Sequence, residues 1–242
     1  MRALGLLVAA AMSLGLPATA DADALADCLA SENIRHCVAL VERATRGDLE
    51  AAGEALTRAA VSLAEMTGRD AALLAVAPSA QAFAVYVERE CTRRRLMLDA
   101  GTGAGDAELA CRAELQAARA ATLWGEVGGR PDLGEVQDRA WRLVAIDGQP
   151  VLEGTDPDLT FGEDGRAGGD ASTNRWFAAY ARHGLGVAFG AAGSTMMYND
   201  EPPGRMAQEQ AYLRTLARVD RLSVEEGRLH LLAEGQSVLE FE

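Results

Sequence analysis

The segment WRLVAIDGQPVLEGTDPDLTFGEDGRAGGD (residues 141–170) decides the fold. Apolar and polar residues alternate at its start, which predicts a strand beginning at Trp141. Asp147-Gly148 follows as a tight-turn signal, and Leu159–Phe161 predicts a second strand. Short apolar runs separated by glycine-containing turns continue in the same way to Glu242.

The rest of this segment predicts further strands and one helix. Residues 174–180 show the least regular pattern, and Pro202-Pro203-Gly204 opens the helix. Many short strands with one helix are typical of a curved antiparallel sheet or partly closed barrel covered by that helix. The expected strands are Arg166–Asp170, Leu185–Phe189, Thr195–Tyr198, Arg221–Val224, Leu229–Leu232 and Val238–Phe241, and the expected inner face of the helix is Met206, Leu213, Leu216 and Val219.

Residues 21–124 predict a helical bundle, because alanine is abundant and apolar residues recur every three or four positions. The glycine- and charge-rich stretch 125–139 is expected to be a linker, and 140–242 the sheet domain, which gives an α+β fold. Ser31, Asp48 and Asp106 are expected helix caps, Gly47 and Gly68 are expected helix ends, and Pro78 is expected to kink or break its helix.

The N-terminus has the pattern of a secretory signal peptide covering residues 1–20. Arg2 precedes the apolar run ALGLLVAAAMSLGL, and Ala18-Thr19-Ala20 supplies a cleavage site. A lipoprotein is less well supported, because the lipid-attachment signal needs a small residue directly before the cysteine and Asp27 precedes Cys28. The apolar run is too short to span a bilayer, and no other segment is expected to approach that length. We therefore expect a soluble, periplasmic or secreted protein without an integral membrane segment.

Four cysteines follow the expected cleavage site, and an even number in an oxidising compartment predicts two disulfides. Three connectivities are possible. Pairing the first with the second and the third with the fourth is preferred, because each bridge closes a short local loop. A metal site is the alternative, but the chain has no Cys-x-x-Cys spacing and only His36 lies near a cysteine. The cysteines are Cys28, Cys37, Cys91 and Cys111.

The chain has a formal net charge of −13, and all 23 of its basic residues are arginine. This charge argues against nucleic acid and anionic lipid surfaces as partners. It suits a basic protein partner, although a solvated acidic surface would give the same composition.

The C-terminal half contains five short motifs in a fixed order. They are Trp141-Arg142-Leu143, Leu159-Thr160-Phe161, Ser172-Thr173-Asn174, Ser194-Thr195-Met196-Met197 and Glu209-x-x-Tyr212-x-x-x-Leu216. Together these motifs resemble the META domain, the fold of the heat-shock protein HslJ. Thr173 and Asn199 stand where many members have cysteines, so no disulfide is expected in this domain. The resemblance implies a role in envelope integrity or stress tolerance and supplies no catalytic residues.

The motif residues are expected to have structural roles. Asn174 can satisfy backbone groups where a strand leaves the sheet. Glu209 is expected beside Thr195 as a helix-to-sheet hydrogen bond, and Trp141 and Trp176 are expected to be core or lid aromatics. The full set of motif residues is Trp141, Phe161, Asn174, Thr195, Met197, Glu209, Tyr212 and Leu216.

The helical half combines an early cysteine pair, Phe83, Tyr86 and Glu88 before Cys91, and the segment ELACRAELQAARAATL (108–123). In these features it resembles the N-terminal family of LprI-like lysozyme inhibitors. It implies lysozyme inhibition, with a basic wall hydrolase such as lysozyme as partner. An acidic exported bundle could attract such a hydrolase electrostatically.

No catalytic, cofactor or metal constellation is found in the sequence. His36, His183 and His230 are isolated, and the absence of lysine excludes Ser-x-x-Lys chemistry. The acidic cluster between Asp156 and Asp170 lacks EF-hand spacing. We therefore expect a non-enzymatic protein.

Three rival functions remain open. The META sheet could enclose an apolar pocket for a lipid or a hydrophobic drug, unless Leu143, Phe161, Phe189 and Met197 fill it. A wall enzyme would need paired carboxylates, such as Glu209 with an aspartate. A purely structural envelope protein fits the same sequence.

Overall fold

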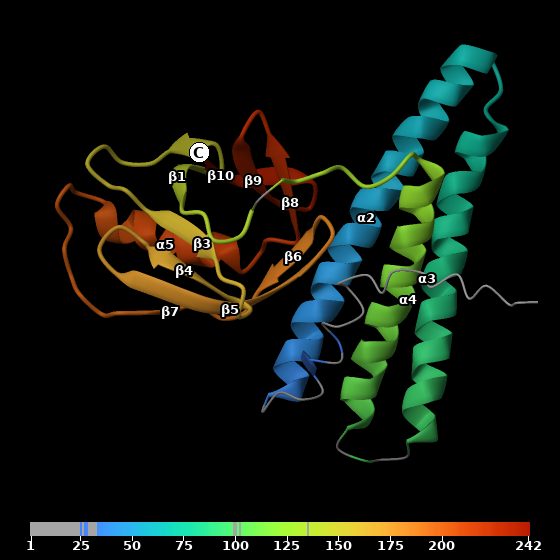
Figure 1. The fold of residues 1–242 in the computed structure, drawn as a ribbon, viewed down its shortest axis with the longest axis horizontal. Coiled ribbons are helices and arrows are strands. Elements are labelled where there is room, and N and C mark those ends of the chain that lie inside the picture. Colours follow the sequence, from blue (N-terminus) through green and yellow to red (C-terminus); the bar gives the residue numbers. More distant parts are fainter. Residues whose placement is uncertain (1–24, 26, 29–32, 99–100, 102, 135) are drawn as a thin grey trace, which may run out of the picture.

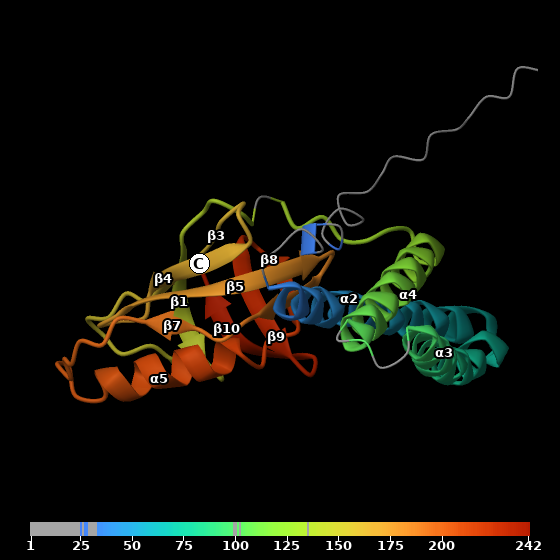
Figure 2. The same ribbon diagram turned by 90° about the horizontal axis from the view of Figure 1, so that it is seen from below.

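The computed structural model describes residues 25, 27–28, 33–98, 101, 103–134 and 136–242. The expected signal peptide and the Ser31 cap lie outside this part of the chain. Three long helices stand beside a β-barrel, and α2 is the helix nearest to the barrel (Figures 1 and 2). The helices are α2 (Ile34–Thr67), α3 (Ala71–Met97) and α4 (Ala104–Glu126).

Helix α2 is a single helix of 34 residues. The expectation that Gly47 ends one helix and Asp48 caps the next is wrong. A glycine inside a helix costs only about 1 kcal/mol relative to alanine, which tertiary packing readily offsets. Gly68, in the left-handed conformation (φ 68°), ends the helix as expected.

Helix α3 continues through Pro78, so this proline does not break the helix. Only Val87 and Cys91 of this helix are buried. Among the described residues, α3 is the one helix that is long and apolar enough to cross a membrane. By this measure of length and composition, the expectation that no segment beyond the N-terminal apolar run approaches membrane-spanning length is wrong. Its ion pairs with α4 join Arg94 to Glu114 and Arg95 to Glu108.

Two disulfides join Cys28 to Cys37 and Cys91 to Cys111, which are the pairings preferred from the sequence. The second bridge ties α3 to α4. The chain has no other cysteine, so the META segment holds no disulfide. Helix α4 begins two residues before Asp106, whose carboxylate pairs with Arg35 of α2.

The C-terminal half is a closed antiparallel barrel. The strand order is β10-β9-β8-β6-β5-β4-β3-β1, and β10 also pairs with β1, which closes the sheet; β2 extends from β1 and β7 pairs with β5. The strands are β1 (Trp141–Ile146), β2 (Gln149–Pro150), β3 (Asp158–Phe161), β4 (Arg166–Asp170), β5 (Arg175–His183), β6 (Gly186–Phe189), β7 (Gly193–Ser194), β8 (Arg221–Glu225), β9 (Arg228–Ala233) and β10 (Gln236–Phe241).

Two strand expectations are wrong. Residues 174–180, expected to be least regular, contain most of β5, the longest strand. Its buried residues Trp176, Ala178 and Tyr180 alternate with exposed residues of mixed polarity, so polarity alone hides the period of two. Residues 195–198, expected to be a strand, lie outside the strands.

Large side chains fill the barrel. Helix α5 (Arg205–Leu216) packs against β1 and β10 and contributes Tyr212 and Leu216 to the core. Met197 is 58% exposed and does not belong to the interior. The largest fully buried side chains include Trp141, Phe161, Phe189, Tyr212 and Phe241.

Helix α2 lies directly on the barrel, against strands β5, β6 and β8. Glycines make this close approach possible. A Cβ on Gly186 would lie 1.7 Å from the Ala44 carbonyl oxygen, and one on Gly47 would lie 2.1 Å from the Asp220 carbonyl oxygen. Helix and strand backbones therefore touch, which requires glycine on both sides.

Candidate functional site

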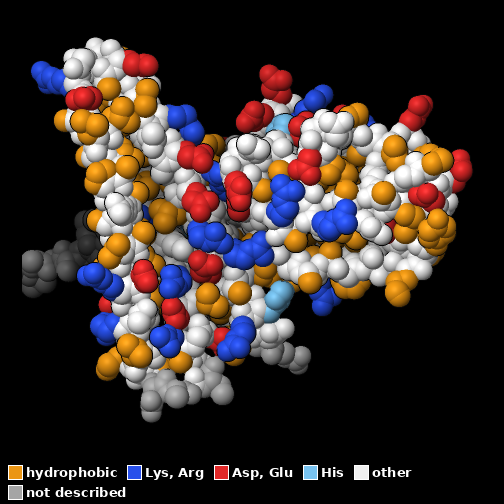
Figure 3. Space-filling model, turned by 180° about the vertical axis from the view of Figure 1, so that it is seen from behind, with side chains coloured by type: hydrophobic (Ala, Val, Ile, Leu, Met, Phe, Trp, Pro, Cys, Tyr) orange, Lys and Arg blue, Asp and Glu red, His pale blue; other side chains and the backbone are white. Residues whose placement is uncertain are grey.

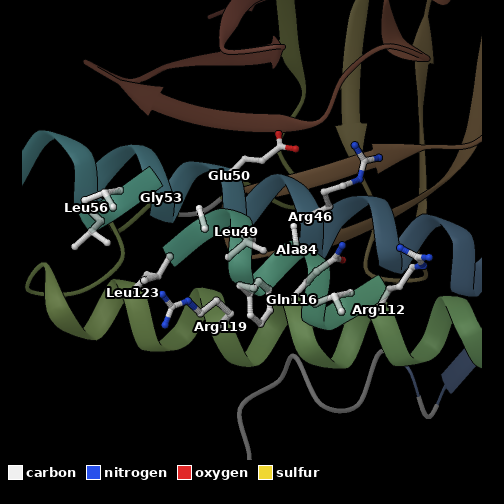
Figure 4. Close-up of a pocket in the computed structure, with 14 residues that line it drawn as sticks. Arg46, Leu49, Glu50, Gly53, Leu56, Ala84, Arg112, Gln116, Arg119 and Leu123 are labelled. Carbon is white, nitrogen blue, oxygen red and sulfur yellow. The ribbon is translucent and has the colours of Figure 1, made fainter. Parts of the chain in front are cut away.

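An apolar groove of about 360 Å³ runs between the three helices (Figure 4). It exists because small residues, among them Gly53, Ala80 and Ala84, stand where larger side chains would fill the bundle. Its apolar lining is Leu49, Leu56, Val76, Ala80, Phe83, Ala84, Val87 and Leu123.

Polar side chains also line this groove. Arg112 donates to Glu108 at 2.9 Å, and Arg46 lies 3.6 Å from Glu42. Each pair lies within its own helix, and in each the arginine is more exposed than its carboxylate partner. Such pairs typically contribute only about 0.3–0.5 kcal/mol, so both arginines can exchange partners easily.

Arg119 is held differently. Its Nη2 donates to the Ser79 hydroxyl at 3.1 Å, and its guanidinium lies 5.8 Å from the centre of the Phe83 ring. Among the described residues, no carboxylate lies within ion-pair distance of Arg119. Glu50 is the single carboxylate of the lining, and burial raises its pKa. The groove thus combines apolar walls with three arginines, two of them paired with carboxylates and Arg119 held by a hydroxyl and an aromatic ring.

The opposite face of α2 carries the fully buried Asp48. Its carboxylate accepts hydrogen bonds from the Trp124 indole at 3.1 Å, the Leu185 backbone N–H at 3.1 Å and Arg130 at 2.8 Å. The His183 ring nitrogen Nδ1 lies 3.3 Å from the same carboxylate. One side chain therefore joins the bundle, the segment after α4 and the turn between β5 and β6.

Burial alone would raise the pKa of Asp48. The hydrogen bonds from His183, Leu185 and Trp124, together with the positive charge of Arg130, outweigh burial and hold this pKa below its ordinary value. The carboxylate is therefore charged and well satisfied inside the junction.

Two further arginines make contacts along the junction, and Figure 3 shows basic and acidic side chains close together where the helices meet the barrel. Arg43 donates to the carbonyl oxygens of Phe189 at 3.0 Å and Ala217 at 3.1 Å. Arg221, whose side chain is only 6% exposed, pairs with Glu54 at 2.8 Å. The sequence analysis missed this junction, because Asp48 after a glycine has the pattern of a helix cap. The signal that the sequence did offer is the spacing of Ala44, Asp48 and Ala51, four and three residues apart, which places Asp48 on the same helix face as two small residues. All three are buried in the structure.

The META motif residues Asn174 and Glu209 form a separate network, with Asn174 directly before β5 and Glu209 on α5. Glu209 accepts from the Asn174 side chain at 2.7 Å and from the backbone N–H groups of Thr173 and Asn174. The Asn174 amide oxygen accepts from the Thr195 hydroxyl at 2.8 Å and from the Met197 N–H at 2.7 Å. Asn174 thus stands between Glu209 and Thr195, which had been expected to meet directly.

The other motif residues are spread through the barrel. Trp141, Phe161, Tyr212 and Leu216 are buried in the core, as is Trp176. All polar side-chain atoms of Asn174 and Glu209 are engaged in hydrogen bonds, and no aspartate of the described residues is hydrogen-bonded to Glu209. This network can hold the segment after β7 in place, and it offers no free group for acid–base chemistry.

No group of three or more His, Cys, Asp or Glu side chains could hold a metal ion within the described ranges. In the acidic cluster, Asp158 instead accepts a hydrogen bond from the Asp170 backbone at 2.7 Å.

Comparisons with known proteins identify the C-terminal part of the chain. The sequence model of the META domain family matches residues 134–242, so this part of the chain is a META domain. A protein from Burkholderia xenovorans solved by NMR is similar to this chain, at 27% identity and a TM-score of 0.38, and the match covers 46% of this chain and 90% of that one. A second NMR structure has 17% identity and a TM-score of 0.38, and covers 46% of this chain and 94% of its own. No curated protein matches the chain.

Proposed function

We propose that this chain is a non-enzymatic binding protein of the cell envelope, with a role in envelope integrity or stress tolerance. It would act after export, in the periplasm or outside the cell. A META domain suggests this setting, and two disulfides are typical of oxidising compartments.

The observation that supports binding by the helical half is its apolar groove. The barrel offers no comparable support, because aromatic and aliphatic side chains fill its interior. The alternative of a small hydrophobic ligand therefore finds better support in the helices than in the META sheet. In this proposal the barrel is a rigid support for α2.

Lysozyme inhibition is the more specific version of the proposal. Residues 33–126 contain 11 Arg and 13 Asp or Glu, a net charge of −2, whereas residues 127–242 contain 11 Arg and 19 Asp or Glu, a net charge of −8. A basic hydrolase would therefore be attracted more strongly by the barrel half than by the helices. Direct measurement of lysozyme binding and activity with residues 21–242 tests this version. No inhibition and no binding at low salt, with excess protein, would overturn it.

Filling the groove tests the broader proposal. Ala84→Trp places an indole among the groove residues, while Ala82→Trp places one on the opposite face of the same exposed helix. A strain lacking the gene should show reduced tolerance of envelope stress. We expect Ala82→Trp to restore tolerance and Ala84→Trp to fail at equal protein level. Full restoration by Ala84→Trp would exclude binding at the groove and favour a purely structural protein.

A further inference from the structure

We propose that the groove between α2, α3 and α4 binds a single-chain anionic amphiphile, of which a long-chain fatty acid is the simplest. The acyl chain would lie between the apolar walls, and the carboxylate would meet Arg46 and Arg112. This inference rests on the proposed role of the helical half as the binding part.

The size of the groove suits one acyl chain. Its volume of about 360 Å³ lies near the lower end of the roughly 300–1,000 Å³ typical of ligand sites. The lining residues of α2 extend from Arg46 to Leu56, which is about 15 Å at 1.5 Å per residue. A narrow apolar channel of this length fits one alkyl chain better than a two-chain lipid.

Two of the three lining arginines lie at one end of the groove. Figure 4 shows Leu56 and Leu123 at one end, with Arg119 beside Leu123, and Arg46 and Arg112 toward the other end, with Gln116 near them. Both arginines make only weak pairs within their own helices. A ligand carboxylate can replace these pairs with charge-assisted hydrogen bonds at little cost.

The electrostatics of the groove favour an anion. Three arginines line it, against one carboxylate, Glu50, whose pKa is raised by burial. Glu42 and Glu108 offset the charges of Arg46 and Arg112 just outside the lining, whereas among the described residues Arg119 has no carboxylate at ion-pair distance. Screening limits the reach of more distant acidic residues to about 8–10 Å, so the charge of Arg119 is the one that favours an anion at the groove. The overall charge would still repel an anionic membrane surface, which favours a dissolved amphiphile over a bilayer.

Calorimetric titration of residues 21–242 with monomeric dodecanoate tests the inference. We expect saturable binding of one ligand per chain. Ala84→Trp should abolish binding and Ala82→Trp should preserve it, with circular dichroism verifying that both variants fold. Ala80→Trp provides a second groove-filling variant.

Charge variants test the class of ligand. Arg46→Gln with Arg112→Gln should weaken dodecanoate binding about tenfold, as expected when a charge-assisted hydrogen bond worth about 1.4 kcal/mol is lost. Arg58→Gln is the matched control, because Arg58 is 71% exposed on α2 and does not line the groove. Dodecyltrimethylammonium, which has the same chain and the opposite charge, should bind at least tenfold more weakly than dodecanoate.

The outcomes separate this inference from the proposed function. Equal binding of both amphiphiles, or no effect of the paired arginine change, would overturn the anionic specificity and leave the groove as a binding site. Absence of dodecanoate binding to the unmodified chain would overturn the inference entirely. The stress-tolerance comparison of Ala84→Trp with Ala82→Trp would then decide the proposed function independently.

Discussion

At the scale of single residues, the buried carboxylate of Asp48 accepts hydrogen bonds from both halves of the molecule at the junction. Asp48→Ala removes the carboxylate that accepts hydrogen bonds from the Trp124 indole, the Arg130 guanidinium and the Leu185 backbone N–H. Breaking a buried charged network costs about 3 kcal/mol or more. We expect a loss of that size in urea unfolding. Asp48→Asn should cost less, because an amide oxygen still accepts from Leu185 or Trp124.

The lowered pKa of Asp48 predicts a specific dependence of stability on pH. A carboxylate with a depressed pKa in the folded state stabilises the fold fully above its unfolded pKa, and this stabilisation is lost as pH falls through the folded value. The loss should therefore begin below about pH 4. Subtracting the stability of Asp48→Asn from that of the unmodified protein at each pH isolates this contribution. A difference that stays constant down to strong acid would contradict it.

Two glycines of α2 should respond oppositely to alanine. Gly47 faces the Asp220 carbonyl oxygen, whereas an added Cβ on Gly53 meets nothing within 4 Å. Gly53→Ala should stabilise by about 0.5–1 kcal/mol through helix propensity. Gly47→Ala should destabilise by about 1–3 kcal/mol, because the helix must move off the barrel. Thermal unfolding of the two variants gives a matched comparison, and stabilisation by Gly47→Ala would show that the close contact is absent.

At the scale of elements, α3 depends on its disulfide. Only Val87 and Cys91 of the helix are buried, so few apolar contacts hold it. Replacing Cys91 and Cys111 together by alanine should cost about 2–4 kcal/mol, since their bridge closes a loop of 20 residues. Hydrogen exchange should become faster in α3 than in α2. Unchanged exchange in α3 would mean that its contacts with α4 suffice without the bridge.

Most elements could be predicted from their sequence periods. Strands β1, β3 and β4 follow alternation and glycine turns, and Gly68 ends α2 as its left-handed conformation requires. The break predicted at Gly47 is wrong, because local propensity is weaker than packing against the barrel. Strand β5 was missed because Phe177 is exposed and apolar, which conceals the alternation.

The candidate site was less predictable than the elements. Leu49 and Leu56 recur at helical spacing, but sequence periodicity cannot show whether the helix face that they share is filled. The groove depends on the sizes of Ala80 and Ala84 relative to the neighbours that three helices bring together. The Asp48 junction depends in turn on residues up to 137 positions apart, such as Leu185.

At the scale of the whole molecule, α2 belongs to both halves. One face lines the groove, and the other lies on strands β5, β6 and β8. The segment after α4, expected to be a linker, contributes Arg130 to the same junction. The charged contacts of Arg43, Asp48 and Glu54 therefore couple the folding of the bundle to that of the barrel.

This coupling predicts that the two halves unfold together. Residues 21–242 should show one thermal transition, with a calorimetric enthalpy equal to the van't Hoff enthalpy. Combining Asp48→Ala with Gly47→Ala should weaken the junction without changing either core, so the transition should separate into two. Gly53→Ala, in the same helix and away from the barrel, should keep a single transition. Two transitions in the unmodified protein would show that the halves are independent and that α2 gains little from the barrel.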